Sequence, residues 1–345
     1  MKCHFTSILA GSALVLSALS FAGPANAAVT TELDADASGL VTITEPGHYV
    51  DTDGTSFRTV SIASDDVTLD GLTFDGAGTT AAGAGVRNAA PGLSNIAVLN
   101  SGFSGYTGRA IAFGFAEGIG QKADRGSNFT VAGNTLDDMA GNAATSIAVF
   151  DTDGVSITDN DISNANTAFT GRRGINLDSN SSVVVRGNTV SLGASGTLGG
   201  PSYPVFSAAP WAIQVSMSNA PVLDHSIMDN TLSGSYDGIV VLSQRDVTGL
   251  KIVANDIAAG FGVRLNAGSA TSVTSPLTFS AIEVSGNRID ATAFDGISYG
   301  VRLQDSPSIT YRDVRITGNI SVATTASVVV GQNANLDKVL VRGNR

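Results

Sequence analysis

The chain has 345 residues, of which 43% are hydrophobic and 14% are charged, and its formal net charge at neutral pH is −11. The acidic balance disfavours nucleic acid or an anionic membrane surface as a partner, although a local basic strip could still hold an anionic polysaccharide. The only cysteine, Cys3, cannot form a disulfide framework, so the fold must be held by its core.

Residues 1–27 are predicted to be a signal peptide. They combine a positive start at Lys2, an apolar run over residues 8–21 and the cleavage pattern Ala25-Asn26-Ala27. This run is too short for a membrane span, and no later stretch approaches the roughly 18 apolar residues that a span needs. We therefore expect a secreted or periplasmic protein without a membrane span.

Residues 28–66 are predicted to form a leading strand and a cap, with "TITEPGHYV" at 42–50 as the strand. From residue 67 to residue 345 one short frame recurs, as in "SVVVRGNTVSL" at 181–191 and "LKIVANDIAAG" at 250–260. The recurring asparagines, at intervals of 25 to 42 residues, are Asn134, Asn160, Asn188, Asn230, Asn255, Asn287, Asn319 and Asn344.

The frame predicts a strand, a sharp corner and a second strand. The residue three positions before the asparagine is Val or Ile in every copy, and apolar residues alternate with other residues around it. Alternation with a period of two indicates a strand with one buried face. Another short strand precedes each frame, as in "GINLD" at 174–178, "GIVVL" at 238–242 and "GVRLN" at 262–266.

A repeat with three short strands cannot bury a face alone, but it can do so when each coil stacks on the next about 4.8 Å away. This indicates an all-β fold, a single-stranded parallel β-helix of roughly ten coils with an asparagine ladder at one corner. The frame, together with the preceding G-[IV]-x-L strand, resembles the right-handed parallel β-helix repeat of the pectin-lyase-like superfamily. The resemblance spans roughly residues 40–345 and implies a fold, because this superfamily hosts lyases, hydrolases, epimerases, tailspikes and adhesins.

The repeated asparagine is interpreted as scaffold. Asparagine tolerates a left-handed corner conformation at little cost. Stacked side chains can also hydrogen-bond from coil to coil and satisfy the buried groups of the corner. We therefore expect a structural ladder and look for function elsewhere.

In the G-[IV]-x-L strands, the second and fourth residues are expected to point inward, and the third and fifth outward. Polar outward residues concentrate in the second half of the chain. Arg264, Arg302 and Asp178 are the candidate catalytic residues, and Asn176, Gln214, Asn266 and Gln304 are candidate substrate-binding residues. Arg264 and Arg302 are expected to be neighbours, with Asp178 about three coils, or roughly 14 Å, away. Two stacked arginines could grip a sugar carboxylate; alternatively, they are ordinary exposed charges.

The longest interval contains a loop rich in Gly and Pro at residues 191–213, which carries Tyr203 and the single tryptophan, Trp211. Loops inserted in a solenoid often carry function, and a rigid aromatic face can stack on a sugar ring. The alternative, weighed about evenly, is that the loop covers its own small apolar cluster.

Signals for a metal are weak. The sequence "DTDG" at 51–54 and 151–154 could suggest calcium, but it lacks the acidic spacing of an EF-hand, and Asp-Gly turns explain it better. His225 occupies a position of the frame that is otherwise apolar, and we expect it to be buried and structural. No metal site is therefore assigned.

Two functions of different classes remain. The first is an exported enzyme, a lyase or epimerase acting on uronic-acid-containing polysaccharide; a glycosidase is less favoured because only Asp178 lies in the outward strip. The second is a non-catalytic polysaccharide-binding protein, an adhesin or a periplasmic accessory protein, favoured by the absence of D-P-H-D and W-I-D-H signatures. The sequence "KVLVRGNR" at 338–345 stops just after a corner, so we also expect end-to-end self-association or fraying of residues 335–345.

Overall fold

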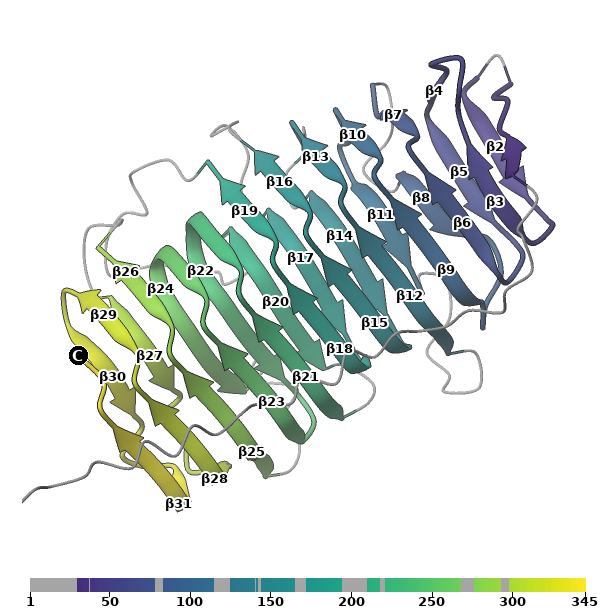
Figure 1. Ribbon diagram of the computed structural model, residues 1–345. Helices are drawn as coiled ribbons and strands as arrows, with labels where there is room; N and C mark the ends of the chain where they lie inside the picture. Colours follow the sequence, from purple (N-terminus) through teal and green to yellow (C-terminus); the bar gives the residue numbers. More distant parts are fainter. Residues whose placement is uncertain are drawn as a thin grey trace, which may run out of the picture.

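The computed structural model describes residues 30–36, 38–77, 83–114, 125–139, 141, 144–164, 172–193, 210–217, 221–267, 276–292 and 298–345. The predicted signal peptide and Tyr203 lie outside these ranges. Within them, strands are the only regular elements, and no helix is long and apolar enough to cross a membrane. The coils stack along one axis, from the purple N-terminal strands to the yellow C-terminal strands (Figure 1).

The first sheet holds the strand that precedes the corner in every coil. Its 12 strands follow each other in chain order. They are β1 (Thr30–Glu32), β3 (Gly47–Val50), β6 (Val67–Asp70), β9 (Ser94–Leu99), β12 (Gly126–Ala132), β15 (Thr152–Thr158), β18 (Ser181–Arg186), β21 (Val222–Met228), β23 (Val247–Val253), β25 (Leu277–Ser285), β28 (Ile309–Thr317) and β31 (Asn335–Arg342). Neighbouring strands are parallel and keep the frame in register, so that Val131 pairs with Ile157 and Ile157 with Val185.

The second sheet holds two further series of parallel strands. Those that follow the corner are β4 (Ser56–Phe57), β7 (Thr73–Asp75), β10 (Gly102–Ser104), β13 (Thr135–Asp137), β16 (Asp161–Asn164), β19 (Thr189–Leu192), β26 (Arg288–Ala291) and β29 (Ile320–Ala323). Those of the G-[IV]-x-L type are β2 (Leu40–Ile43), β5 (Thr59–Ile62), β8 (Ala84–Asn88), β11 (Arg109–Phe113), β14 (Thr145–Phe150), β17 (Arg173–Asp178), β20 (Trp211–Met217), β27 (Tyr299–Leu303) and β30 (Ala326–Val330). In β22 (Thr231–Ser243) and β24 (Asp256–Ala267) the two types run together.

The inward residues of all three series form one aliphatic core. Val185, Ile162 and Ile213, which come from three different series of strands, are fully buried in it. Residues 28–66, predicted as a leading strand and cap, contribute β1 to β5, and these pair in parallel with the coils that follow. A separate N-terminal unit ending at residue 66 stays a prediction.

The asparagine ladder is confirmed. Asn188 donates from Nδ2 to Oδ1 of Asn230 at 2.9 Å, and its own Oδ1 accepts from Nδ2 of Asn160 at 2.9 Å and from the backbone N–H of Asn160 at 3.1 Å. Its Nδ2 also donates to the carbonyl of Ile157. This pattern continues from Asn134 to Asn344.

One reason given for the ladder is wrong. The left-handed backbone lies not at the asparagine but one residue before it. The residues with positive φ at this corner include Gly133, Asp159, Gly187, Asp229, Ala254, Gly286, Gly318 and Gly343, with φ between 55° and 67°. The preceding residue reverses the chain, and this leaves the asparagine free to turn its amide into the coil. Hydrogen bonding, rather than tolerance of strain, explains why the asparagine recurs.

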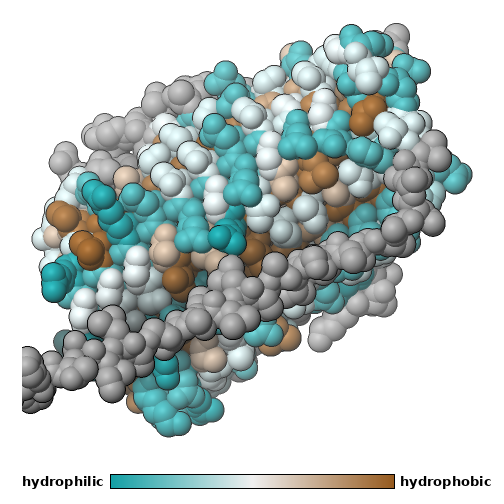
Figure 2. All heavy atoms as spheres, in the orientation of Figure 1, coloured by the Kyte–Doolittle hydropathy of each residue, from teal (hydrophilic) through white to brown (hydrophobic). Residues whose placement is uncertain are grey.

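At the C-terminal end of the described solenoid, several apolar side chains are exposed, among them Ile320, Val322 and Leu336. Elsewhere on the face shown in Figure 2, polar and weakly polar residues alternate with separate hydrophobic areas. End-to-end self-association and fraying of residues 335–345 stay predictions.

Candidate functional site

The glycine of the G-[IV]-x-L strand sets which side chains face outward. A Cβ on Gly174 would come within 2.5 Å of Val190, and one on Gly238 within 2.3 Å of Ile257, so each glycine faces the crowded interior. The residue after the glycine is buried in the core as well. The residue before the glycine therefore points outward, together with the third and fifth residues of the motif.

Three columns of outward side chains result. We call the part of these columns that lies on β17, β20, β22, β24 and β27 the outer face. The column expected from the sequence runs Asn176, Gln214, Val240, Arg264 and Arg302. A second expected column begins Asp178, Ser216, Leu242 and Asn266. The column that the sequence analysis missed runs Arg173, Trp211, Asp237, Phe261 and Tyr299.

The expected neighbours are in place. Arg264 pairs with Arg302 in adjacent coils, and Asn176 pairs with Gln214. Asp178 lies three coils before Asn266 in its own column. The strand register alone was enough to predict these relations, because every coil repeats the same frame.

The outward strip is not the solvated surface that was expected. Asn176, Gln214, Arg264 and Asn266 are each at most 7% exposed, whereas Asp178, Arg302 and Gln304 are partly exposed. Side chains of adjacent columns pack over one another: the Arg264 guanidinium lies 5.4 Å from the ring centre of Phe261 and 5.8 Å from that of Tyr236. Large aromatic groups from the missed column thus bury the polar groups beside them.

A buried ion pair lies at the centre of this face. Arg264 donates from Nη2 to Oδ2 of Asp237, and both side chains are almost fully buried. Burial raises the pKa of the Asp237 carboxyl to about 6, although Arg264, the Trp211 indole and Arg302 act to lower it. The charge of Arg264 is therefore offset within the protein, and its expected role in binding a sugar carboxylate stays a prediction. The only sequence signal for Asp237 is an acidic residue directly before the glycine of "GIVVL".

Arg302 differs from its neighbour. Its guanidinium lies 5.4 Å from the ring centre of Tyr299, and no carboxylate of the described chain lies within ion-pair distance of it. Gln304, two residues on, is committed to the backbone, since its Oε1 accepts the N–H of Ala267 at 2.6 Å. Among the described arginines of the expected column, Arg302 is the cation that remains available to a ligand.

Trp211 is buried in the structure. It begins β20, is 3% exposed and packs against Val240, while the guanidinium of Arg173 covers its ring at 5.1 Å. Tyr203 lies outside the described residues, so its role stays a prediction. The structure supports the alternative in which Trp211 covers a small apolar cluster of its own.

Acidic and histidine side chains elsewhere have structural partners. Glu32, Asp51 and Asp53 come together within 4.8 Å, but their carboxylates accept hydrogen bonds from backbone N–H groups and hydroxyls of residues 52–55, as in an Asp-Gly turn. His225 is 1% exposed, as expected, and burial lowers its pKa to about 4.

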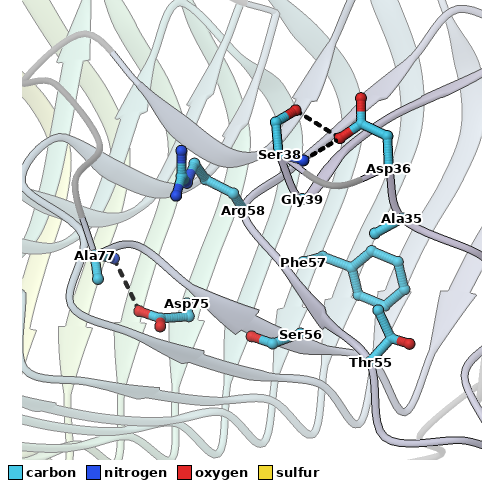
Figure 3. Close-up of a pocket in the computed structure, with 10 residues that line it drawn as sticks. All are labelled: Ala35, Asp36, Ser38, Gly39, Thr55, Ser56, Phe57, Arg58, Asp75 and Ala77. Atoms are coloured by element: carbon cyan, nitrogen blue, oxygen red, sulfur yellow. Dashed lines mark hydrogen bonds between the residues drawn. The ribbon is translucent and has the colours of Figure 1, made fainter.

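A groove of about 320 Å³ lies at the other end of the solenoid, on the coils of β2 to β7 (Figure 3). Its walls include Phe57, Arg58 and two acidic residues. Asp36 accepts hydrogen bonds from the N–H and the hydroxyl of Ser38, and Asp75 accepts one from the N–H of Ala77, so both carboxylates close local turns. The groove shares no residue with the outer face.

The sequence matches no protein-family model and no curated protein. Among solved structures, the chain is similar to a tailspike protein of E. coli bacteriophage HK620 in complex with a pentasaccharide, with a TM-score of 0.53 and 13% identity over 88% of this chain and 56% of that chain. It is also similar to an exopolygalacturonase from Thermotoga maritima (TM-score 0.47, 8% identity, 85% and 84% covered). A third similar structure is the A-module of a mannuronan C-5 epimerase from Azotobacter vinelandii (TM-score 0.45, 15% identity, 91% and 88% covered).

The parallel coils, the asparagine ladder and the tailspike likeness together define the fold. It is a right-handed parallel β-helix, as the repeat predicted. The chain spans little more than half the length of the tailspike that it matches.

Proposed function

We propose that the protein is an exported, carbohydrate-active β-helix that acts on a uronic-acid-containing polysaccharide as a lyase or an epimerase. The observation that carries the proposal is Arg302, a partly buried guanidinium on the outer face with no carboxylate of the described chain within ion-pair distance. The β-helices to which the chain is similar include a tailspike bound to a pentasaccharide.

Both reactions begin with removal of the proton next to the sugar carboxylate, and this requires that the carboxylate charge be offset. A guanidinium can do so through two parallel hydrogen bonds. Arg302 is suited to this because Tyr299 lies against its guanidinium and because the neighbouring Arg264 is already neutralised by Asp237. The acidic polysaccharide would then run across the coils, with Asn266 and Asp178 contacting other sugar units.

The acid–base group is a separate requirement of the proposed reactions. Arg264 is not suited to act as a base, because its guanidinium is paired and arginine keeps its proton. Asp178 lies on β17, four coils from Arg302 on β27, or roughly 19 Å at one strand spacing per coil. Asp237 has a pKa suited to proton transfer near neutral pH, but it is fully buried.

The burial of Asp237 favours a second candidate function, non-catalytic binding of the same class of polysaccharide. In that case the outer face recognises an acidic glycan, as an adhesin or a periplasmic accessory protein would, and Asp237 serves to hold Arg264 in place. Arg302 has the same role in both candidates, since it binds the carboxylate.

A panel of acidic polysaccharides separates the candidates. Ultraviolet absorbance of an unsaturated product reports a lyase, proton NMR of the uronate units reports an epimerase, and calorimetry reports binding. Product formation supports the enzyme, and binding without product supports the second candidate. If the parent protein neither binds nor alters any acidic polysaccharide, both candidates are wrong.

A further inference from the structure

Three side-chain amides on the outer face, those of Asn176, Gln214 and Asn266, have buried oxygen atoms that accept no hydrogen bond. Asn176 on β17 and Gln214 on β20 are paired in register and are 5% and 7% exposed. Neither Oδ1 of Asn176 nor Oε1 of Gln214 has a donor within hydrogen-bond distance. Buried acceptors are nearly always satisfied in folded proteins, so an unsatisfied pair on one face calls for a reason.

The Gln214 amide is held in one orientation. Its Nε2 donates to Oγ of Ser216 at 3.0 Å, and that hydroxyl in turn donates to the carbonyl of Leu177 at 3.5 Å. With the amide nitrogen engaged in this way, Oε1 is the atom left for an external donor. The Oδ1 of Asn176 is likewise buried and accepts no hydrogen bond, so this atom too has room for a donor from outside the described chain.

The surroundings of the two oxygens limit what can bind. In the same column, Ala148 lies on one side and Val240 on the other, and both are fully buried. The Arg173 guanidinium lies over Trp211 in the neighbouring column and disfavours a metal cation. Two acceptor oxygens repel a carboxylate as well. The remaining donors in a polysaccharide are hydroxyl groups.

We propose that Asn176 and Gln214 form a subsite for an uncharged sugar unit, whose hydroxyls donate to the two amide oxygens. This subsite is distinct from the carboxylate position at Arg302, which lies three coils further along the same column. The separation is roughly 14 Å at one strand spacing per coil. The ligand is thus a polysaccharide of mixed composition, in which neutral and uronic acid units alternate or occur in blocks. The inference rests on the proposed function, in which the outer face binds an acidic glycan.

Stability provides the first test, because a ligand-binding amide and a structural amide respond in opposite ways. Asn176→Leu keeps the branched shape of the side chain and removes the unsatisfied acceptor, so Tm should stay the same or rise. The control is Asn180→Leu, four residues on. Asn180 accepts the N–H of Thr152 at 2.9 Å and donates to the carbonyl of Val149 at 2.8 Å, so its replacement should lower Tm.

Binding provides the second test, on an array that carries an acidic homopolymer, a neutral homopolymer and mixed neutral–acidic oligosaccharides. The parent should prefer the mixed oligosaccharides. Asn176→Leu and Gln214→Met should each reduce this preference over the acidic homopolymer by about tenfold or more, since each removes an acceptor for a hydroxyl. Asn180→Leu, assayed below its Tm, should keep the preference of the parent.

The outcomes distinguish this subsite from the proposed function. If Asn176→Leu lowers Tm as Asn180→Leu does, or if it and Gln214→Met keep the parent's preference, the subsite is wrong. In the second case, loss of acidic homopolymer binding in Arg302→Gln would leave the proposed function standing. If the parent binds no glycan on the array, both proposals are overturned.

Discussion

The corner ladder and the outer face bury the same chemical group, a side-chain amide, under opposite conditions. In the ladder, the oxygen of Asn188 accepts two hydrogen bonds and its nitrogen donates to a neighbouring amide and a backbone carbonyl. On the outer face, the oxygens of Asn176 and Gln214 accept none. A buried amide whose hydrogen bonds are all formed stabilises the fold. A buried amide with an unpaired oxygen lowers stability, and a ligand that donates to this oxygen can offset the loss.

The same contrast applies to the ionisable groups. Asp237 has a single cationic partner and a raised pKa, and His225 is buried among aliphatic side chains with a lowered one. The fold accommodates the Asp237 carboxyl when it is paired or protonated, and the His225 imidazole when it is uncharged. Variants at these positions therefore measure how much these buried groups reduce the stability of the fold, at the outer face and in the core.

The largest loss is expected when the ion pair is broken from the arginine side. Arg264→Met leaves the fully buried Asp237 carboxyl without its cation, and removal of one member of a buried pair typically costs about 3–5 kcal/mol. The loss should be greatest at pH 8 and smaller at pH 4, where the carboxyl can be protonated in both the folded and the unfolded state. Urea unfolding at the two pH values measures this. An equal loss at both pH values would contradict the role of Arg264 in holding the buried Asp237 carboxyl ionised.

The second largest effect concerns His225, whose folded-state pKa of about 4 lies below the ordinary histidine value of 6.5. The unfolded chain binds a proton at this histidine that the folded protein does not bind. The free energy of unfolding therefore decreases as the pH falls from 6.5 through 4. At about 1.4 kcal/mol per pKa unit, the loss is about 3 kcal/mol. His225→Leu should abolish it, so that the variant gains about 3 kcal/mol relative to the parent between pH 7 and pH 4 in urea unfolding. A pH-independent difference between the two would contradict the buried, neutral histidine.

The ladder is tested by Asn188→Ala. Loss of this amide removes the acceptor used by Asn160 and the donor used by Ile157 and Asn230, and each buried group left unpaired costs about 1–3 kcal/mol. Part of the loss should be recovered by local rearrangement, so we expect a decrease of roughly 1–3 kcal/mol in unfolding free energy. Glycan binding below the midpoint of unfolding should equal that of the parent. A fully stable variant without binding would overturn the scaffold interpretation.

Much of the fold could be predicted from the sequence because every coil repeats the same pattern of buried residues. Val or Ile three residues before each asparagine identified the buried strand, and the ladder followed from the spacing of the asparagines. The position of the left-handed residue was missed for a local reason. Gly133 and Gly187 suit positive φ, but Asp159 and Ala254 occupy the same position in other coils, and no single residue type marks it.

The candidate site was predicted only in part. Register placed Arg264 beside Arg302, but it gave no indication that Arg264 is neutralised by Asp237. That pairing depends on the inward-facing glycine, which turns the preceding residue outward and adds a column that alternation alone does not show. Burial of Asn176 and Gln214 depends likewise on side chains from neighbouring coils, and a single repeat does not predict the packing between coils.

The smallest change in stability, and a large change in function, is expected for Arg302→Ala. Arg302 is partly exposed and has no ion pair in the described chain, and its contact with Tyr299 is worth about 1 kcal/mol or less. Its removal should therefore alter the unfolding free energy by no more than about 1 kcal/mol, whereas affinity for an acidic polysaccharide should fall about tenfold or more, because the carboxylate loses its cation. Arg87→Ala is the matched control: Arg87 lies on β8 in the same type of strand, is exposed, and donates to Ser61. Calorimetry with one acidic polymer compares the three proteins. If Arg302→Ala binds as the parent and Arg87→Ala do, the outer face is not the glycan site, and its unsatisfied amides need another explanation.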